Sequence, residues 1–148
     1  MGIKIGKEYK LNGCPSVSTK FGTLDRDNPS VMYVSGRCWV TPCRKEIDQD
    51  AAVSRVRNDI RRTVSRMIGE TKTFAPKMII DIEFNSDKPV VGKKKKLTYD
   101  LYLKQTKSNV KPVEDIYGEM CHISSSVGYL IGERMEEYGF SVEKSKTI

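Results

Sequence analysis

The chain has 148 residues, 38% of them hydrophobic and 30% charged, and 26 Lys and Arg against 19 Asp and Glu leave a formal net charge of +7. This length suits a single domain over residues 1–148 whose core needs no disulfide or metal support. No apolar run reaches the ~18 residues of a membrane span, and no secretory signal pattern is present. We therefore expect a cytoplasmic protein, in a bacterial or host cell, that is not secreted and has no membrane partner.

Charge is uneven along the chain. Residues 1–45 carry a net +5, residues 46–111 carry +6, and residues 112–148 carry −4. Such asymmetry indicates a surface that faces a polyanion, or self-association in which the two signs meet. The plainer interpretation is that both signs only solvate the faces of one fold.

The N-terminal part predicts a strand followed by a long loop. Residues 2–11 alternate between apolar and polar side chains, which is the period of a half-buried strand. Residues 12–30 are rich in Gly, Pro, Ser, Asp and Asn, which is typical of a loop, with room for one short strand over residues 16–20. Loops of this length are often functional or ordered by a partner.

Residues 31–41 alternate again and predict a second strand. The row of smaller apolar side chains suits the core, so we expect Tyr33, Arg37 and Trp39 to share the outer face. A tight turn at residues 35–36 would instead divide this segment into two very short strands.

The clearest predicted element is a helix in the middle of the chain. Thr41-Pro42 is typical of a helix start, with a capping hydroxyl before a proline in the first turn. From Val53 to Met67, apolar side chains recur at steps of three and four. Gly69 is expected to stop the helix soon afterwards.

A hairpin is predicted next. Residues 78–84 and residues 97–103 both alternate strictly, and the connection over residues 85–96 ends in the run Lys93-Lys94-Lys95-Lys96. This connection is too long for a tight turn and highly charged. We therefore expect a basic hairpin tip that projects into solvent.

A second amphipathic helix is predicted from Pro112 to a left-handed stop at Gly139, followed by a polar tail over residues 141–148. The chain order of strands and helices predicts the fold class. It is an α+β two-layer sandwich, with a mostly antiparallel sheet, two long amphipathic helices on one face and a protruding Lys-rich hairpin.

Catalytic chemistry is hard to assemble from these residues. His122 is the single histidine, and its neighbour Cys121 points about 100° away on a helix. The cysteines at 14, 38, 43 and 121 include no C-x-x-C pair, so they do not predict a zinc site. No phosphate-binding glycine motif occurs either. We predict no catalytic residue, no metal and no cofactor.

The least favoured alternative is a metal-dependent nuclease. Asp81, Glu83 and Asp100 are expected on the outward face of the hairpin, where carboxylates of paired strands could hold a divalent ion. The lysine that nucleases often place two residues after the acid is missing, since Asn85 stands there. Cross-strand pairing with lysines explains these carboxylates equally well.

Five of the nine arginines fall between residues 55 and 66, on the first predicted helix. Relative to the apolar stripe, they lie along two flanks, Arg55, Arg62 and Arg66 on one and Arg57 and Arg61 on the other. The planar fork of arginine binds phosphate and stacks on bases. The alternative is that acidic residues of the same helix, Asp59 among them, neutralise several of these arginines.

We therefore predict a small basic, non-enzymatic protein that engages nucleic acid or a nucleoprotein assembly. Its binding residues are expected to be the helix arginines, the Lys93–Lys96 tip, and the group Tyr33, Arg37 and Trp39, whose rings can stack unpaired bases. We expect affinity to fall steeply with salt, and binding to be lost on reversal of Arg55, Arg62 and Arg66 to Glu.

The rival prediction is a protein–protein module, such as an assembly subunit of a viral or phage particle, or a small viral inhibitor of a host enzyme. In that case the basic body meets an acidic protein surface, or the acidic last helix of a neighbouring copy in a homo-oligomer. Tyr33 and Trp39 would then anchor the interface.

Overall fold

A computed structural model describes residues 8–11, 17–24, 30–86, 88–106 and 110–143 of the chain. Within these residues, six strands and two long helices follow one another in the order β-β-β-α-β-β-α-β. Their bounds are β1 Glu8–Leu11, β2 Ser18–Thr23, β3 Val31–Pro42, α1 Gln49–Thr71, β4 Phe74–Phe84, β5 Lys95–Gln105, the short 3-10 helix η2 Val113–Ile116, α2 Tyr117–Glu137 and β6 Phe140–Val142.

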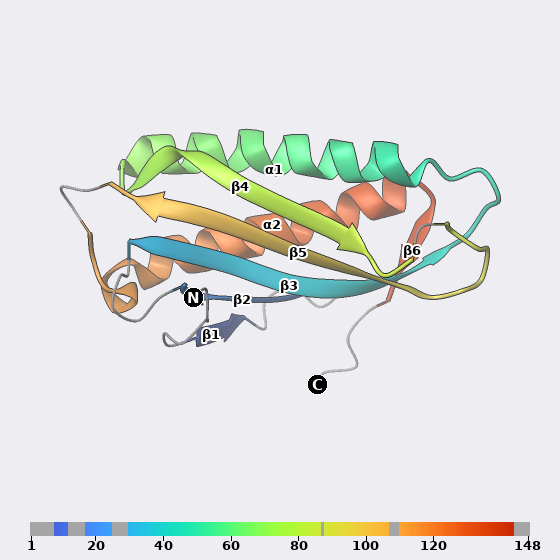
Figure 1. Cartoon of the computed structure of the whole chain (residues 1–148), viewed down its shortest axis with the longest axis horizontal. Coiled ribbons are helices and arrows are strands. Elements are labelled where there is room, and N and C mark those ends of the chain that lie inside the picture. Colours follow the sequence, from blue (N-terminus) through green and yellow to red (C-terminus); the bar gives the residue numbers. More distant parts are fainter. Residues whose placement is uncertain (1–7, 12–16, 25–29, 87, 107–109, 144–148) are drawn as a thin grey trace.

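The strands form one antiparallel sheet in the order β1-β2-β3-β5-β4. The short β6 pairs with the end of β3, where Val40 lies between Val142 of β6 and Lys95 of β5. Both long helices lie over the same face of this sheet (Figure 1). No helix of the described residues lies over the other face, which we call the uncovered face. The predicted α+β class with an antiparallel sheet is confirmed.

Side-chain alternation places one row of each strand against the helices. On β3, the row Met32, Val34, Cys38 and Val40 is at most 2% exposed, as predicted. The facing rows of the hairpin are buried in the same core, namely Met78, Ile80, Ile82, Leu97, Tyr99, Leu101 and Leu103. Burial of each large side chain contributes about 1.5–3 kcal/mol, so these rows hold the two layers together.

Gly36 lies in the middle of β3, which runs without a turn at residues 35–36. The Tyr99 side chain of β5 passes over Gly36 and donates its hydroxyl hydrogen to the carbonyl oxygen of Ser18, on β2, at 2.8 Å. A Cβ at position 36 would lie 1.9 Å from that oxygen. Glycine is therefore required there for close approach, and the Tyr99 hydroxyl ties three strands together.

The start of α1 differs from the prediction. Thr41 and Pro42 do not begin a helix, because both pair with β6 and remain in the extended β3. The helix begins at Gln49 instead, where the Asp48 carboxylate accepts a hydrogen bond from the Ala51 backbone N–H at 2.9 Å. The sheet contact of residues 41–42 overrides a local helix signal, and an acidic N-cap supplies the real one.

Gly69 does not end α1, which continues to Thr71 and is capped by the left-handed Lys72. Ile68 is 3% exposed, so core packing continues to the last turn and holds the glycine in helical conformation. The second predicted helix, from Pro112 to a stop at Gly139, appears as η2 followed by α2. Gly139, just after α2, has a positive φ of 97°.

Two segments predicted as a loop and a tail contain strands, and the first of these strands overlaps the short strand allowed over residues 16–20. The loop expected over residues 12–30 includes β2, whose Phe21 is fully buried, and the tail expected over residues 141–148 includes most of β6. Both strands form by pairing with β3, a long-range contact that no local pattern shows. The rest of these two segments, like most of the strand predicted over residues 2–11, falls largely outside the described residues.

Candidate functional site

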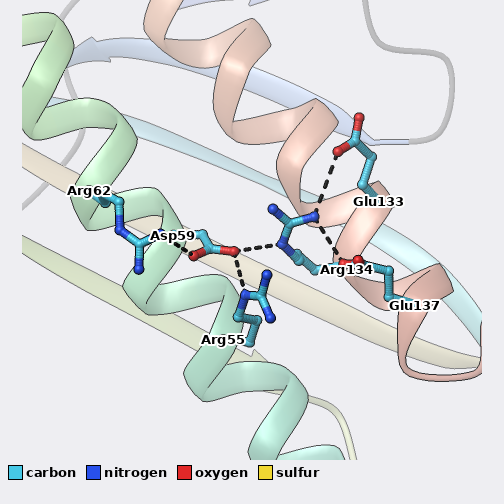
Figure 2. Close-up of polar contacts among 6 residues, drawn as sticks. All are labelled: Arg55, Asp59, Arg62, Glu133, Arg134 and Glu137. Atoms are coloured by element: carbon cyan, nitrogen blue, oxygen red, sulfur yellow. Dashed lines mark hydrogen bonds and ion pairs between the residues drawn. The ribbon is translucent and has the colours of Figure 1, made fainter.

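The arginines of α1 divide into a paired group and an exposed group. Asp59 faces α2 with 5% of its side chain exposed, and it accepts hydrogen bonds from Arg55 at 2.7 Å and from Arg134 at 2.6 Å (Figure 2). Arg62 lies 3.6 Å from the other carboxylate oxygen of Asp59. Arg134 is also 2.9 Å from Glu137, in its own helix. Two of the five helix arginines therefore belong to an ion cluster that joins α1 to α2.

This ion cluster is electrically balanced. It holds three arginines and three carboxylates, namely Arg55, Arg62, Arg134, Asp59, Glu133 and Glu137. The hydrogen bond from Arg134, reinforced by Arg55, keeps the pKa of the Asp59 carboxyl below its usual range despite burial. The carboxylate therefore stays ionised at neutral pH, and the charges of Arg55 and Arg62 are offset within the cluster.

The other three helix arginines do not converge on one site. Arg66 is exposed and makes no ion pair with any described residue. Arg57 and Arg61 lie on the opposite flank of α1, over β4, where Arg57 shares a shallow cavity with Glu83 and Arg61 shares another with Ile79.

The lysine run does not form one exposed tip. Lys95 begins β5 and is 2% exposed, with its ammonium group bonded to the Gln49 side chain and 4.8 Å from the centre of the Phe84 ring. The prediction of a solvent-exposed lysine is wrong here, because strand alternation turns Lys95 toward the helices. The loop before it is tied to the sheet, since the Gly92 N–H donates to the Pro42 carbonyl oxygen at 3.0 Å.

Two other lysines of the run lie beside Trp39, on the sheet face without helices. Trp39 is 36% exposed, and the ammonium groups of Lys94 and Lys96 lie 5.3 and 5.8 Å from its ring centre. Lys94 also pairs with Glu143 at 2.8 Å. Lys93 is exposed in the loop. An aromatic ring with adjacent cations is thus accessible on this face.

Tyr33, predicted to lie beside Arg37 and Trp39, has no exposed surface. Its hydroxyl donates to the Glu8 carboxylate, and burial, followed by that bond and the Glu8 charge, raises its pKa well above the usual range. Tyr33 is therefore a structural residue in this conformation. Arg37 and Trp39 are the members of this group that remain at the surface.

A shallow cavity of about 460 Å³ opens on the same sheet face, and we call it the sheet-face cavity. Four cations from four different strands line it, Lys10 of β1, Lys20 of β2, Arg37 of β3 and Lys96 of β5. Lys96 is the register partner of Trp39, so the ring lies next to the cavity. The described lining also includes Ser18, Thr19, Ser35, Gly36, Thr98, Tyr99 and the carboxylate of Asp100.

Two features of the sheet-face cavity are unfavourable without a ligand. Ser35 is 5% exposed, and its hydroxyl has no hydrogen-bond partner among the described residues, a condition that costs about 1–3 kcal/mol in a buried group. Lys10 lies directly opposite Lys20, and like charges in that position destabilise a sheet, although Glu8 lies 3.4 Å from Lys20. An anionic oxygen in the cavity would offset both terms.

Within the described residues, the side chains considered for catalysis do not come together in one site. Asp81 lies directly opposite Asp100 on the uncovered face and Glu83 opposite Thr98, yet among the described residues no three His, Cys, Asp or Glu side chains could hold a metal ion. His122 is exposed on α2. The three cysteines within the described residues are separate, Cys38 buried, Cys43 exposed and Cys121 partly buried.

The acidic C-terminal part is largely engaged within the chain. Five of its seven acidic side chains have a partner. Glu133 and Glu137 contact Arg134, Glu114 accepts a hydrogen bond from Tyr9 at 3.3 Å, Glu119 accepts one from Thr73 at 2.9 Å, and Glu143 pairs with Lys94 at 2.8 Å. Fewer acidic groups are thus available for the basic body of a neighbouring copy than the charge count suggests.

Comparisons of the chain with protein-family models, with curated proteins and with solved structures found no match. Within the described part of the chain, no helix has the length and apolar character needed to cross a membrane. A function can therefore be inferred only from the sheet-face cavity and its surroundings.

Proposed function

We propose that this protein is a non-enzymatic binding protein that holds single-stranded nucleic acid across its uncovered sheet face. The observation that carries the proposal is the sheet-face cavity, whose lining combines cations from four strands with the carboxylate of Asp100 and with the buried Ser35 hydroxyl, which has no partner among the described residues. In this arrangement phosphates occupy the cavity, and an adjacent base stacks on Trp39. The binding residues are Lys10, Lys20, Ser35, Arg37, Lys96 and Trp39.

The lysines beside Trp39 do not block stacking. A cation–π contact at an exposed site is worth about 0.5–1 kcal/mol, whereas stacking of a base on an aromatic side chain is worth about 1–3 kcal/mol. A base can therefore replace the ammonium group of Lys94 or Lys96 over the ring. The released lysine then pairs with the phosphate backbone, so both groups contribute.

A single strand fits this face better than a duplex does. Stacking on Trp39 needs an unpaired base whose flat face is accessible, and a duplex hides that face between neighbouring base pairs. The rival partner, an acidic protein, would supply carboxylates to the same cations. It is one of the outcomes that the following binding experiment distinguishes.

The test is fluorescence anisotropy with labelled single-stranded DNA, single-stranded RNA and a duplex of the same sequence. We expect the single strands to bind more tightly than the duplex. If three or four phosphates are neutralised, the logarithm of the binding constant should fall with the logarithm of salt concentration with a slope of about −2 to −3. Absence of binding, or an affinity that does not change with salt, would contradict the proposal and favour a protein partner.

Variants locate the binding surface. Arg37→Gln and Lys96→Gln should each weaken single-strand binding about tenfold and reduce the salt slope by about 0.7. Arg66→Gln is the matched control, because it removes the same charge from an exposed position on α1. Equal losses for Arg66→Gln and Arg37→Gln would place binding on the helix face instead. Reversal of Arg55 or Arg62 is a poor test, since both residues contact Asp59.

A further inference from the structure

We propose that β4 pairs with β4 of a second copy of the chain, extending the antiparallel sheet across a two-fold axis at Ile79. In the described sheet, β4 pairs with β5 on one side and no strand lies on its other side. The β4 edge is eleven residues long, whereas β1, at the other end of the sheet, has four described residues. Ile79, near the middle of β4, is 61% exposed.

The backbone of β4 is oriented for such pairing. The Asn85 N–H donates to the Lys96 carbonyl oxygen, and the register of β4 with β5 is regular from Phe84 back to Met78. Because backbone groups of an antiparallel strand alternate in direction, Ile79, Asp81 and Glu83 bond toward β5. Residues 78, 80 and 82 therefore direct their N–H and C=O groups toward the open edge.

Charge and apolar surface select one register with a second copy. When Ile79 lies opposite Ile79 of the second copy, Lys77 lies opposite the second copy's Asp81, and Asp81 lies opposite its Lys77. Asp81 already faces the like charge of Asp100 on its β5 side, so a lysine on its other side offsets that repulsion. The same register places Met78 opposite Ile80 of the second copy, on the sheet face that the helices cover.

Edge strands often carry Lys, Pro and bulges that prevent pairing, and β4 has all three near its start, at Pro76, Lys77 and a register shift before Met78. An edge protected along its whole length would not expose an isoleucine near its centre. Arg57 and Arg61, on the flank of α1 above β4, would face the second copy and oppose association. We therefore expect a dimer of modest affinity, held mainly by the backbone ladder and Ile79.

Dimer formation through β4 does not depend on nucleic-acid binding, although a dimer and a bound nucleic acid are compatible. Antiparallel pairing about an axis perpendicular to the sheet places both uncovered faces on the same side. Two sheet-face cavities would then lie on one continuous sheet, and a strand long enough to reach both would bind more tightly through the higher effective concentration. Arg37→Gln, which should weaken nucleic-acid binding, should leave the dimer unchanged.

The test is sedimentation velocity over a range of protein concentrations without nucleic acid. The chain should pass from monomer to dimer as its concentration rises, and Ile79→Lys should weaken the dimer at least about tenfold by placing like charges opposite each other. Val91→Lys is the control, because Val91 is an exposed apolar residue, at 49%, outside β4. Circular dichroism confirms that each variant is folded.

A charge exchange tests the register. Lys77→Asp and Asp81→Lys should each weaken the dimer, and the double variant should restore it, since the opposite charges then meet in exchanged positions. A chain that stays monomeric at every concentration would overturn the proposal. So would a dimer that Ile79→Lys leaves intact, or one that the double variant fails to restore after the single variants have weakened it.

Discussion

Replacing Asp59 with alanine should lower the free energy of unfolding by about 2–3 kcal/mol at neutral pH. Removing one partner of a buried ion pair costs about 3–5 kcal/mol, because the other charge stays buried without compensation. Arg134 is only partly buried, with 20% of its side chain exposed, and it retains Glu137, so we expect a smaller loss. Chemical denaturation measures this change. Glu136→Ala, which removes an exposed carboxylate from α2, is the control and should have little effect.

The loss should depend on pH in a defined direction. The pKa of Asp59 is lowered in the folded protein, chiefly by the hydrogen bond from Arg134, so folding favours the ionised carboxylate. Its contribution to stability is complete above the unfolded pKa of about 3.9 and disappears as pH falls through the lower folded value. The stability difference between wild type and Asp59→Ala should therefore shrink in acid. A difference that stays constant down to low pH would show that the ionised carboxylate is not the cause.

Replacing Gly36 with alanine should lower the free energy of unfolding by about 2–3 kcal/mol. The new Cβ would lie 1.9 Å from the Ser18 carbonyl oxygen and 2.5 Å from the Tyr99 hydroxyl, so the strands or the tyrosine must move. Overpacking of a core costs about 1–3 kcal/mol, and loss of the Tyr99 hydrogen bond adds about 1 kcal/mol. Thermal and denaturant unfolding both measure the change.

Gly69→Ala is the matched control, and we expect the opposite sign. Gly69 lies within α1, and a Cβ there would meet no atom within 4 Å. Glycine in a helix interior is less stable than alanine by about 0.5–1 kcal/mol, so this substitution should stabilise the protein by that amount. Similar losses for the two variants would contradict the close contact assigned to Gly36.

The sheet and helices were predictable where local periodicity and burial agree. The alternation of residues 31–41, 78–84 and 97–103 appears as β3, β4 and β5, and the three-four spacing from Val53 to Met67 appears in α1. From these elements the two-layer α+β class follows. The short strand allowed over residues 16–20 appears as β2 over residues 18–23, and β6 was missed. Both are short and depend on pairing with β3, a contact distant in sequence.

The candidate site was predictable only in part. Alternation placed Arg37 and Trp39 on the outer face, and both remain at the surface there. It also placed Tyr33 there, but Tyr33 is fully buried and its hydroxyl donates to Glu8, on another strand. The partners of Arg37 in the sheet-face cavity come from β1, β2 and β5, and a single chain pattern does not show which strands will be neighbours.

The prediction from charge counts was least accurate for the helices. The helix arginines indicated a basic surface, but Asp59 and Arg134 connect two of them to the carboxylates of α2. Asp59 was recognisable as a neutralising group within its own helix. Its contact with Arg134 was not, because it depends on how α1 and α2 pack. The cations that gather in the sheet-face cavity instead come from strands far apart in the sequence.

The most direct measurement is the fluorescence of Trp39 during titration with a single-stranded oligonucleotide. Trp39 is the sole tryptophan of the chain, so its emission reports on the proposed site without interference from another indole. Stacking of a base on its ring should quench the emission in a saturable way, and Arg37→Gln should shift the titration to higher concentrations. Binding detected by anisotropy with no change in Trp39 emission would contradict a site on the uncovered sheet face.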